Sequence, residues 1–244
     1  MPRMRIIALT GVLAALAAGA AQGQSTSAGP VTIAPLVGYM KWDDGAGLDN
    51  SPLAGLSATY RVRGGLALGA FLEGGRPVTL GRYFPASLLN TAGSTQLFLV
   101  SQRTTLVNYG ARAQYGMNVG GGEAYLSVGL GQYTVFPDVQ QTGVPATFSG
   151  MSWETGAGFG VSLGQSASVR FDARAVHFRK WDRARLNPVE PAYRNTLYPD
   201  VQDYPLNVPK LGCDSNASGA GNYCSLLNWR LGVAFVFYPQ GAGR

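Results

Sequence analysis

Apolar and polar residues alternate with a period of two over residues 150–163, which read GMSWETGAGFGVSL. One set of positions carries bulky apolar side chains from Met151 to Leu163, and the other carries mostly glycine with a single carboxylate, Glu154. A two-residue period predicts a β-strand. In a soluble barrel, the face opposite the apolar one would be rich in Lys, Glu and Thr. A glycine-rich polar face instead indicates the narrow interior of a barrel whose apolar face lies against lipid.

The same alternation recurs in seven further segments. We expect eight strands, at about 32–42, 53–62, 66–76, 104–117, 123–136, 150–163, 167–178 and 227–238. Short glycine-containing turns alternate with the long connections 43–51, 77–103, 137–149 and 179–226. Proline recurs in 179–226 and cannot donate to a strand ladder, so we expect a loop there. Because an even number of strands closes a sheet with no free edge, as hydrocarbon requires, the sequence predicts an all-β fold, an eight-stranded antiparallel transmembrane β-barrel with short periplasmic turns and long extracellular loops.

The N-terminal residues have the pattern of an export signal. Arg3 and Arg5 precede an apolar core from Ile6 to Ala18, and small residues follow it. A membrane-spanning helix needs roughly 20 apolar residues, so this core is too short to span, and a retained helical anchor is the alternative. We expect a signal peptide at 1–23, a short linker at 24–31, the barrel at 32–238 and a C-terminal tail at 239–244.

Composition agrees with a surface that is mostly wetted by lipid. Only 13% of residues are charged, 34 are glycine, and the formal net charge is +6 with no long basic run, so we expect no nucleic-acid partner. Cys213 and Cys224 are the only cysteines, and in an exported chain they predict a disulfide. With one histidine and no zinc-like spacing, we expect no metal and no cofactor. Aromatic residues near predicted strand ends are candidates for interfacial girdles: Tyr39, Trp42, Tyr60, Tyr115, Trp153, Phe237 and Tyr238.

The last predicted strand, Arg230 to Phe237, is similar to the assembly signal of small outer-membrane barrels, in which a polar residue is followed by a glycine and by alternating apolar residues. Over nearly its whole length the chain resembles the eight-stranded barrels of Gram-negative bacteria typified by the transmembrane domain of outer membrane protein A. The resemblance implies an outer-membrane location, with outer-membrane lipid, lipopolysaccharide and the barrel assembly machinery as partners. One departure is that residues from Tyr238 to Arg244 follow the signal.

Strand parity places a set of charged side chains inside the barrel. The expected interior ion-pair network consists of Glu73, Arg112, Glu154, Arg170, Asp172, Arg174 and Arg230, and Arg61 and Glu123 also point inward. Unpaired charges in a narrow lumen would be costly, so the near balance of charge predicts pairing, above all between Glu154 and Arg174 on adjacent strands. The arrangement is similar to the interior ion-pair gate of the outer membrane protein A family. It is either a structural plug or a gate that exchanges partners, and an eight-stranded interior is too narrow for a diffusion pore.

His177, the only histidine, is expected on the lipid side near the extracellular rim. Lipid A deacylases, which resemble this chain in size, carry a catalytic His closely followed by Ser, but Phe178, Arg179 and Lys180 follow here, so we expect no enzyme. The basic residues Arg179, Lys180, Arg183 and Arg185 are either lipopolysaccharide contacts or solvated loop charges. The expected function is a structural or surface-interaction role through the extracellular loops, with an extracellular partner that the sequence does not identify. The alternatives are a lipid A-modifying outer-membrane enzyme and a soluble lipocalin-like barrel that binds a ligand.

Overall fold

The computed structural model describes residues 31–89, 95–139, 147–164, 167–189 and 224–238. The expected signal peptide (1–23), most of the linker and the tail at 239–244 lie outside these residues. Cys213 and the side chain of Cys224 also lie outside them, so the disulfide stays a prediction. In the part of the chain that is described, no helix is long and apolar enough to cross a bilayer.

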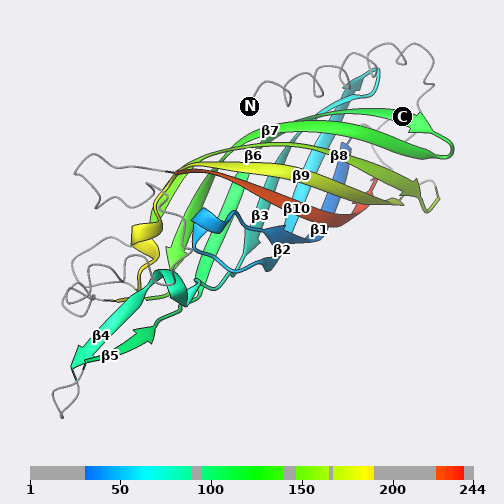
Figure 1. Ribbon diagram of the computed structural model, residues 1–244. Coiled ribbons are helices and arrows are strands. Elements are labelled where there is room, and N and C mark those ends of the chain that lie inside the picture. Colours follow the sequence, from blue (N-terminus) through cyan, green and yellow to red (C-terminus); the bar gives the residue numbers. More distant parts are fainter. Residues whose placement is uncertain (1–30, 90–94, 140–146, 165–166, 190–223, 239–244) are drawn as a thin grey trace, which may run out of the picture.

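Eight antiparallel strands form a closed barrel (Figure 1). They are β1 (Val31–Lys41), β2 (Ser51–Arg63), β3 (Leu66–Gly75), β6 (Thr104–Val119), β7 (Gly122–Pro137), β8 (Phe148–Ser162), β9 (Ala167–Trp181) and β10 (Cys224–Phe237). The barrel closes where β1 pairs with β10, with Met40 opposite Arg230. The predicted fold class and the eight predicted strands are confirmed, each within about three residues at its ends.

The two ends of the barrel differ in their connections. Tight turns join β2 to β3 and β6 to β7, and Gly64, Gly65, Gly120 and Gly121 have φ between 55° and 88° there, in the region that favours glycine. The opposite end carries the long connections, and three of them contain a short 3-10 helix: η2 (Asp44–Ala46), η3 (Gly81–Tyr83) and η4 (Arg183–Leu186). We refer to these as the short-turn end and the long-loop end.

The connection 77–103 contains structure that the alternation of residues did not predict. β4 (Pro85–Leu89) and β5 (Thr95–Leu99) form a separate two-stranded antiparallel sheet. Figure 1 shows this hairpin projecting beyond the long-loop end of the barrel. The hairpin is therefore a separate element beyond the long-loop end and not part of the barrel wall.

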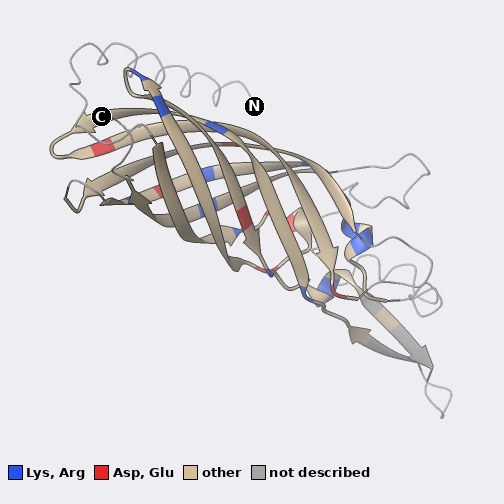
Figure 2. Ribbon diagram, turned by 180° about the vertical axis from the view of Figure 1, so that it is seen from behind, with Lys and Arg blue, Asp and Glu red and all other residues tan. Residues whose placement is uncertain are grey.

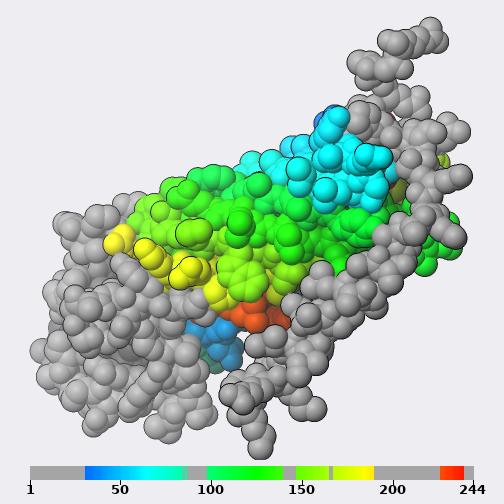
Figure 3. Space-filling model, turned by 90° about the horizontal axis from the view of Figure 1, so that it is seen from above, coloured from blue at the N-terminus to red at the C-terminus, as the bar shows by residue number. Residues whose placement is uncertain are grey.

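The outer face of the wall is apolar. Leu130, Leu231 and Met151 are each at least 60% exposed, and Leu56, Leu72 and Phe235 are about half exposed. These residues occupy the positions that strand parity predicted to face lipid. In the space-filling view, side chains fill the spaces between neighbouring strands on the face shown (Figure 3). Such a continuous apolar exterior is suited to hydrocarbon and not to water.

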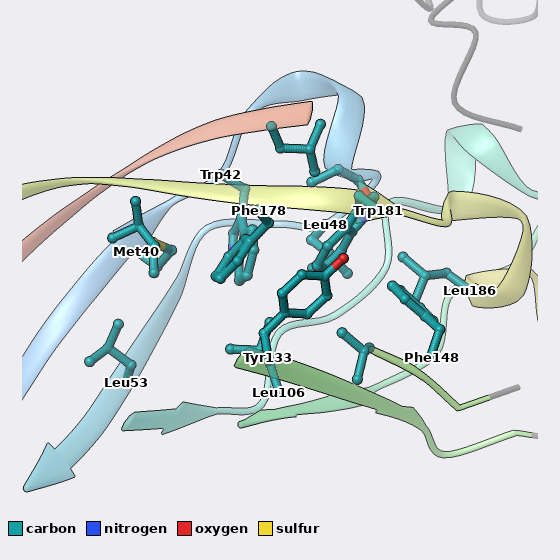
Figure 4. Close-up of a cluster of buried hydrophobic side chains, with 14 of the residues drawn as sticks. Met40, Trp42, Leu48, Leu53, Leu106, Tyr133, Phe148, Phe178, Trp181 and Leu186 are labelled. Carbon is teal, nitrogen blue, oxygen red and sulfur yellow. The ribbon is translucent and has the colours of Figure 1, made fainter. Parts of the chain in front are cut away.

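The interior near the long-loop end is apolar rather than polar, which differs from the expectation of a polar lumen. Trp181 is fully buried, with ring centroids 5.7 Å from Trp42, 5.5 Å from Tyr133 and 5.8 Å from Phe178 (Figure 4). The Trp181 indole N–H donates to the backbone oxygen of Ala46 at 3.1 Å. Trp42, expected in an interfacial girdle, is only 6% exposed and belongs to this cluster, so that prediction is wrong. We call these buried aromatic residues, together with Phe148, the aromatic cap.

Candidate functional site

Six charged side chains meet halfway along the barrel interior and alternate in sign around a closed ring. In ring order they are Glu73, Arg112, Glu154, Arg174, Asp172 and Arg230. Each is less than a tenth exposed. Figure 2 shows the charged positions on the barrel strands between the two ends. We call this arrangement the ionic ring, and its formal charge is zero.

Every arginine of the ionic ring bridges two carboxylates. Arg112 donates to Glu73 at 3.0 Å and to Glu154 at 2.5 Å. Arg174 donates to Glu154 at 3.2 Å and to Asp172 at 2.8 Å, and also to the hydroxyl of Ser127. The ring thus includes the expected pair of Glu154 and Arg174.

Arg230 on β10 closes the ring by bridging its last two carboxylates. Its guanidinium donates to Asp172 on the adjacent strand β9 and to Glu73 on β3, 157 residues away in the sequence. Charge-assisted hydrogen bonds are stronger than neutral ones, and in a buried site each charge requires such a partner. The ring therefore ties β3, β6, β8, β9 and β10 together through the lumen.

Glycine on neighbouring strands makes room for these long side chains. Gly129 lies directly opposite Glu154, and a Cβ at Gly129 would lie 2.8 Å from the Glu154 Cγ. Gly156 lies opposite Arg174, and a Cβ there would lie 2.6 Å from the Arg174 Cγ. Gly129 on β7 and Gly156 on β8 thus leave the space that the side chains of the ring occupy.

Arg170 is also buried and ion-paired inside the barrel, but it lies in a second cluster that does not join the ring. Arg170 lies two residues nearer the short-turn end than Asp172. The Arg170 side chain pairs with Glu123 at 3.1 Å, and Glu123 also pairs with Arg61 at 3.3 Å. Arg61 and Glu123 are about a quarter and a fifth exposed, so this second cluster is partly solvated. The Arg170 guanidinium also lies 5.3 Å from the centre of the Tyr125 ring.

Little space is left beside these charges. The cavity between the ionic ring and the short-turn end has a volume of about 10 Å³ and is lined by Arg61, Glu123, Tyr125 and Arg170 among others. That is about the space of a single water molecule. Above the ring, a polar layer follows in which the Ser152 hydroxyl donates to Asn108 at 2.7 Å, and the aromatic cap lies beyond it. Among the described residues, no three side chains of the types His, Cys, Asp and Glu gather into a metal-binding group.

The four basic residues predicted at the rim occupy different environments. Arg179 and Lys180 are exposed. Arg185 donates to Asp182 at 3.1 Å and to the Thr147 backbone oxygen at 3.0 Å. Arg183 is only 6% exposed, with its guanidinium 4.7 Å from the centre of the Tyr83 ring, so it is not an exposed rim charge as expected. Arg183 and Arg185 lie beyond the end of β9, where strand parity does not set the direction of a side chain, so the sequence did not distinguish them from Arg179 and Lys180.

His177 lies on the outer face of β9, as strand parity predicted. Its ring centroid is 4.7 Å from that of Trp153, which stands directly opposite on β8. The following residue, Phe178, points inward into the aromatic cap.

The interior features that sequence reasoning missed are the aromatic cap and the closure of the ring. Tyr133, Val135 and Phe148 stand at inward positions of their strands, so strand parity contained a signal for the cap. The ring's order of partners depends on the stagger of the strands around the barrel, which the alternation of residues does not contain.

Comparison with known proteins agrees with this architecture. Residues 10–200 match the family described as outer membrane protein beta-barrel domain. Neisserial surface protein A has a similar structure, with a TM-score of 0.51 and 12% identity over 88% of this chain and 100% of that one. The N-terminal β-barrel domain of OprF from Pseudomonas aeruginosa aligns with a TM-score of 0.42 and 11% identity over 86% of this chain and 100% of that one. No curated protein matches the chain.

The family match and the closed apolar-walled barrel together decide between the predicted classes. The soluble lipocalin-like alternative is wrong, because the exposed wall is apolar and the lumen is filled with charged and aromatic side chains. The long-loop end is the extracellular end, as in an outer-membrane barrel with short periplasmic turns. The chain belongs to the outer membrane protein beta-barrel family and is located in the outer membrane of a Gram-negative-type bacterium.

Proposed function

We propose that the protein is a closed outer-membrane barrel without enzymatic activity, which has a structural role and displays its extracellular loops to partners outside the cell. The ionic ring carries this proposal. Its six side chains extend into the lumen from five strands. Every carboxylate and every guanidinium in the ring has two ion-pair partners. A lumen crossed in this way is closed to diffusing solutes.

The aromatic cap supports a plug rather than a gate. It fills the extracellular half of the interior with packed rings, so a solute would have to displace both the cap and the ionic ring. Exchange of partners by Arg174 would break its contacts with Glu154 and Asp172 while the neighbouring arginines hold the same two carboxylates. We therefore favour a static seal.

The display role is supported by the hairpin of β4 and β5. It projects beyond the extracellular end of the barrel and forms a structured surface above the membrane (Figure 1). A two-stranded hairpin alone is marginally stable, so its attachment to a rigid barrel matters for its presentation.

Single-channel recording in planar bilayers tests the closed barrel. The wild-type protein is expected to show small and infrequent openings, whereas Glu154→Ala is expected to change their size or frequency because the ring is opened. Leu130→Ala on the exposed outer face is the matched control and is expected to behave as the wild type does. Long-lived, frequent openings of the wild-type protein would contradict the proposal.

The absence of enzymatic activity has its own test. Mass spectrometry of lipid A from cells with and without the protein is expected to show the same acyl chains. Loss of an acyl chain that depends on His177 would establish the lipid A-modifying alternative instead.

A further inference from the structure

The extracellular end of β9 contains a β-bulge. Phe178 pairs with Leu226 and Trp181 pairs with Cys224, so two residues of β9, Arg179 and Lys180, stand opposite a single residue of β10. Lys180 has φ of 60° and is the one non-glycine residue with positive φ in the described ranges. For an L-amino acid this conformation is sterically strained. Bulges of this kind re-aim side chains.

The bulge changes which way the side chains point. In a regular strand, one of two consecutive residues would point into the lumen, which here is the aromatic cap. With the extra residue, Phe178 and Trp181 are both fully buried, and Arg179 and Lys180 are both exposed. The strand therefore presents two adjacent cations on its outer face.

Contacts inside the barrel hold this conformation. The Tyr133 hydroxyl donates to the backbone oxygen of Arg179 at 2.8 Å. Gly150 permits this approach, because a Cβ there would lie 2.3 Å from the same oxygen and 2.7 Å from the Tyr133 hydroxyl. Since the interior fixes the backbone of Arg179, the placement of the two cations is a built feature of the fold.

The cations border a depression in the outer wall of about 500 Å³. Its lining residues are Gly131, Gln132, Ser149, Gly150, Met151, Arg179 and Lys180, and we call it the rim pocket. No carboxylate among the described residues lines it or pairs with Arg179 or Lys180. Polar Gln132 and Ser149 stand beside Met151, which is 60% exposed, and the Trp153 and His177 pair lies further toward the membrane centre. The pocket is thus cationic at the extracellular rim and apolar toward the membrane centre. A lipid of the outer leaflet changes in the same direction, from its head group to its acyl chains.

We propose that the rim pocket binds a phosphorylated glycolipid of the outer leaflet, with lipid A as the chemical class. Arg179 and Lys180 contact a phosphate, Gln132 and Ser149 offer hydrogen bonds to the sugar, and an acyl chain runs over Met151 and Trp153. Guanidinium and ammonium groups both bind phosphate, and each basic residue near an anionic membrane surface contributes about a fivefold gain in affinity. This site is on the outer wall, so it is independent of whether the lumen is closed.

Native mass spectrometry of the full chain in detergent, titrated with diphosphoryl lipid A, tests the proposal. The double variant Arg179→Gln with Lys180→Gln is expected to bind roughly 30-fold more weakly, about fivefold for each charge. The matched control, Lys41→Gln with Arg103→Gln, removes two exposed charges from other positions near the extracellular end and is expected to lose less than about twofold. Lipid A without phosphates is expected to bind the wild-type protein as weakly as the double variant does.

Two further variants separate loss of the site from loss of the fold. Lys180→Gly fits the positive φ, so it is expected to fold and to bind about fivefold more weakly. Arg179→Lys with Lys180→Arg keeps both charges and is expected to bind within about twofold of the wild type. An equal loss in the rim and control double variants, unchanged binding by Lys180→Gly, or equal binding of phosphate-free lipid A would overturn the proposal.

Discussion

Replacing Glu154 by glutamine tests the energetics of the ionic ring. Glu154 is 2% exposed and accepts from Arg112 and Arg174 through one oxygen, Oε1. Glutamine has nearly the same volume, so the loss is electrostatic and no cavity forms. Removing one partner of a buried ion pair typically costs about 3–5 kcal/mol. Because Arg112 keeps Glu73 at 3.0 Å and Arg174 keeps Asp172 at 2.8 Å, we expect about 3 kcal/mol, the lower end of this range.

The second half of this prediction is a double-mutant cycle. Arg174→Met alone leaves the ring one positive charge short, but together with Glu154→Gln it removes one charge of each sign. The remaining Arg112, Glu73, Arg230 and Asp172 form a neutral chain. The double variant is therefore expected to lose about 2 kcal/mol less than the sum of the two single losses, within the usual range for coupled neighbours.

Urea unfolding in lipid vesicles, followed by tryptophan fluorescence and by heat-modifiable gel migration, gives these free energies. Glu123→Gln is the matched control, because Glu123 also pairs with two arginines but its side chain is 21% exposed. Solvent screening limits the expected loss there to about 1 kcal/mol or less. Additive single losses, or equal losses for Glu154→Gln and Glu123→Gln, would refute the view that the ring is a coupled buried network.

Three other substitutions probe the extracellular half of the barrel by the same unfolding assay. Trp181→Ala removes a fully buried ring of the aromatic cap and is expected to cost about 3–5 kcal/mol, whereas Trp229→Ala, 54% exposed on the outer wall, is expected to cost less than half as much. Equal losses would mean that the cap is not tightly packed. Gly150→Ala places a Cβ 2.3 Å from the Arg179 oxygen and is expected to cost about 2 kcal/mol, and an unchanged stability would show that the bulge adjusts freely. Lys180→Gly relieves positive φ at some entropic cost and is expected to raise stability by up to about 1 kcal/mol, so a clear loss would count against strain at that residue.

The strands and their facing were predictable because the lipid and the lumen impose opposite demands on successive residues. On β3, Leu68 and Leu72 are about half exposed on the wall, while Phe71 and Glu73 between and beside them are less than a twentieth exposed. Along each strand, apolar lipid-facing residues therefore alternate with lumen-facing residues with a period of two. The same parity predicts from the sequence alone that Glu73 and Arg112 point into the lumen, where both are buried.

Contacts that depend on the barrel as a whole were not predictable in this way. Arg230 and Glu73 meet across the lumen from strands that are not neighbours, so no sequence period relates them. An aromatic residue at a strand end is typical both of an interfacial girdle and of a barrel interior, so the sequence alone predicts a girdle position for Trp42. Its packing against Phe178 and Trp181 shows that it is interior.

The bulge on β9 is another departure from the two-residue period, and it lies beside the proposed rim pocket. If the alternation of β9 continued without a bulge past Phe178, Lys180 would point inward, and a cation in the aromatic cap would lack a partner at a high cost. The chain avoids this cost by accepting positive φ at Lys180, and the Tyr133 hydroxyl then satisfies the carbonyl of Arg179. A regular strand would have kept the two-residue period but would have brought at most one cation to the rim pocket. The departure from the period thus couples the packing of the interior to the charge that the outer wall presents to lipid.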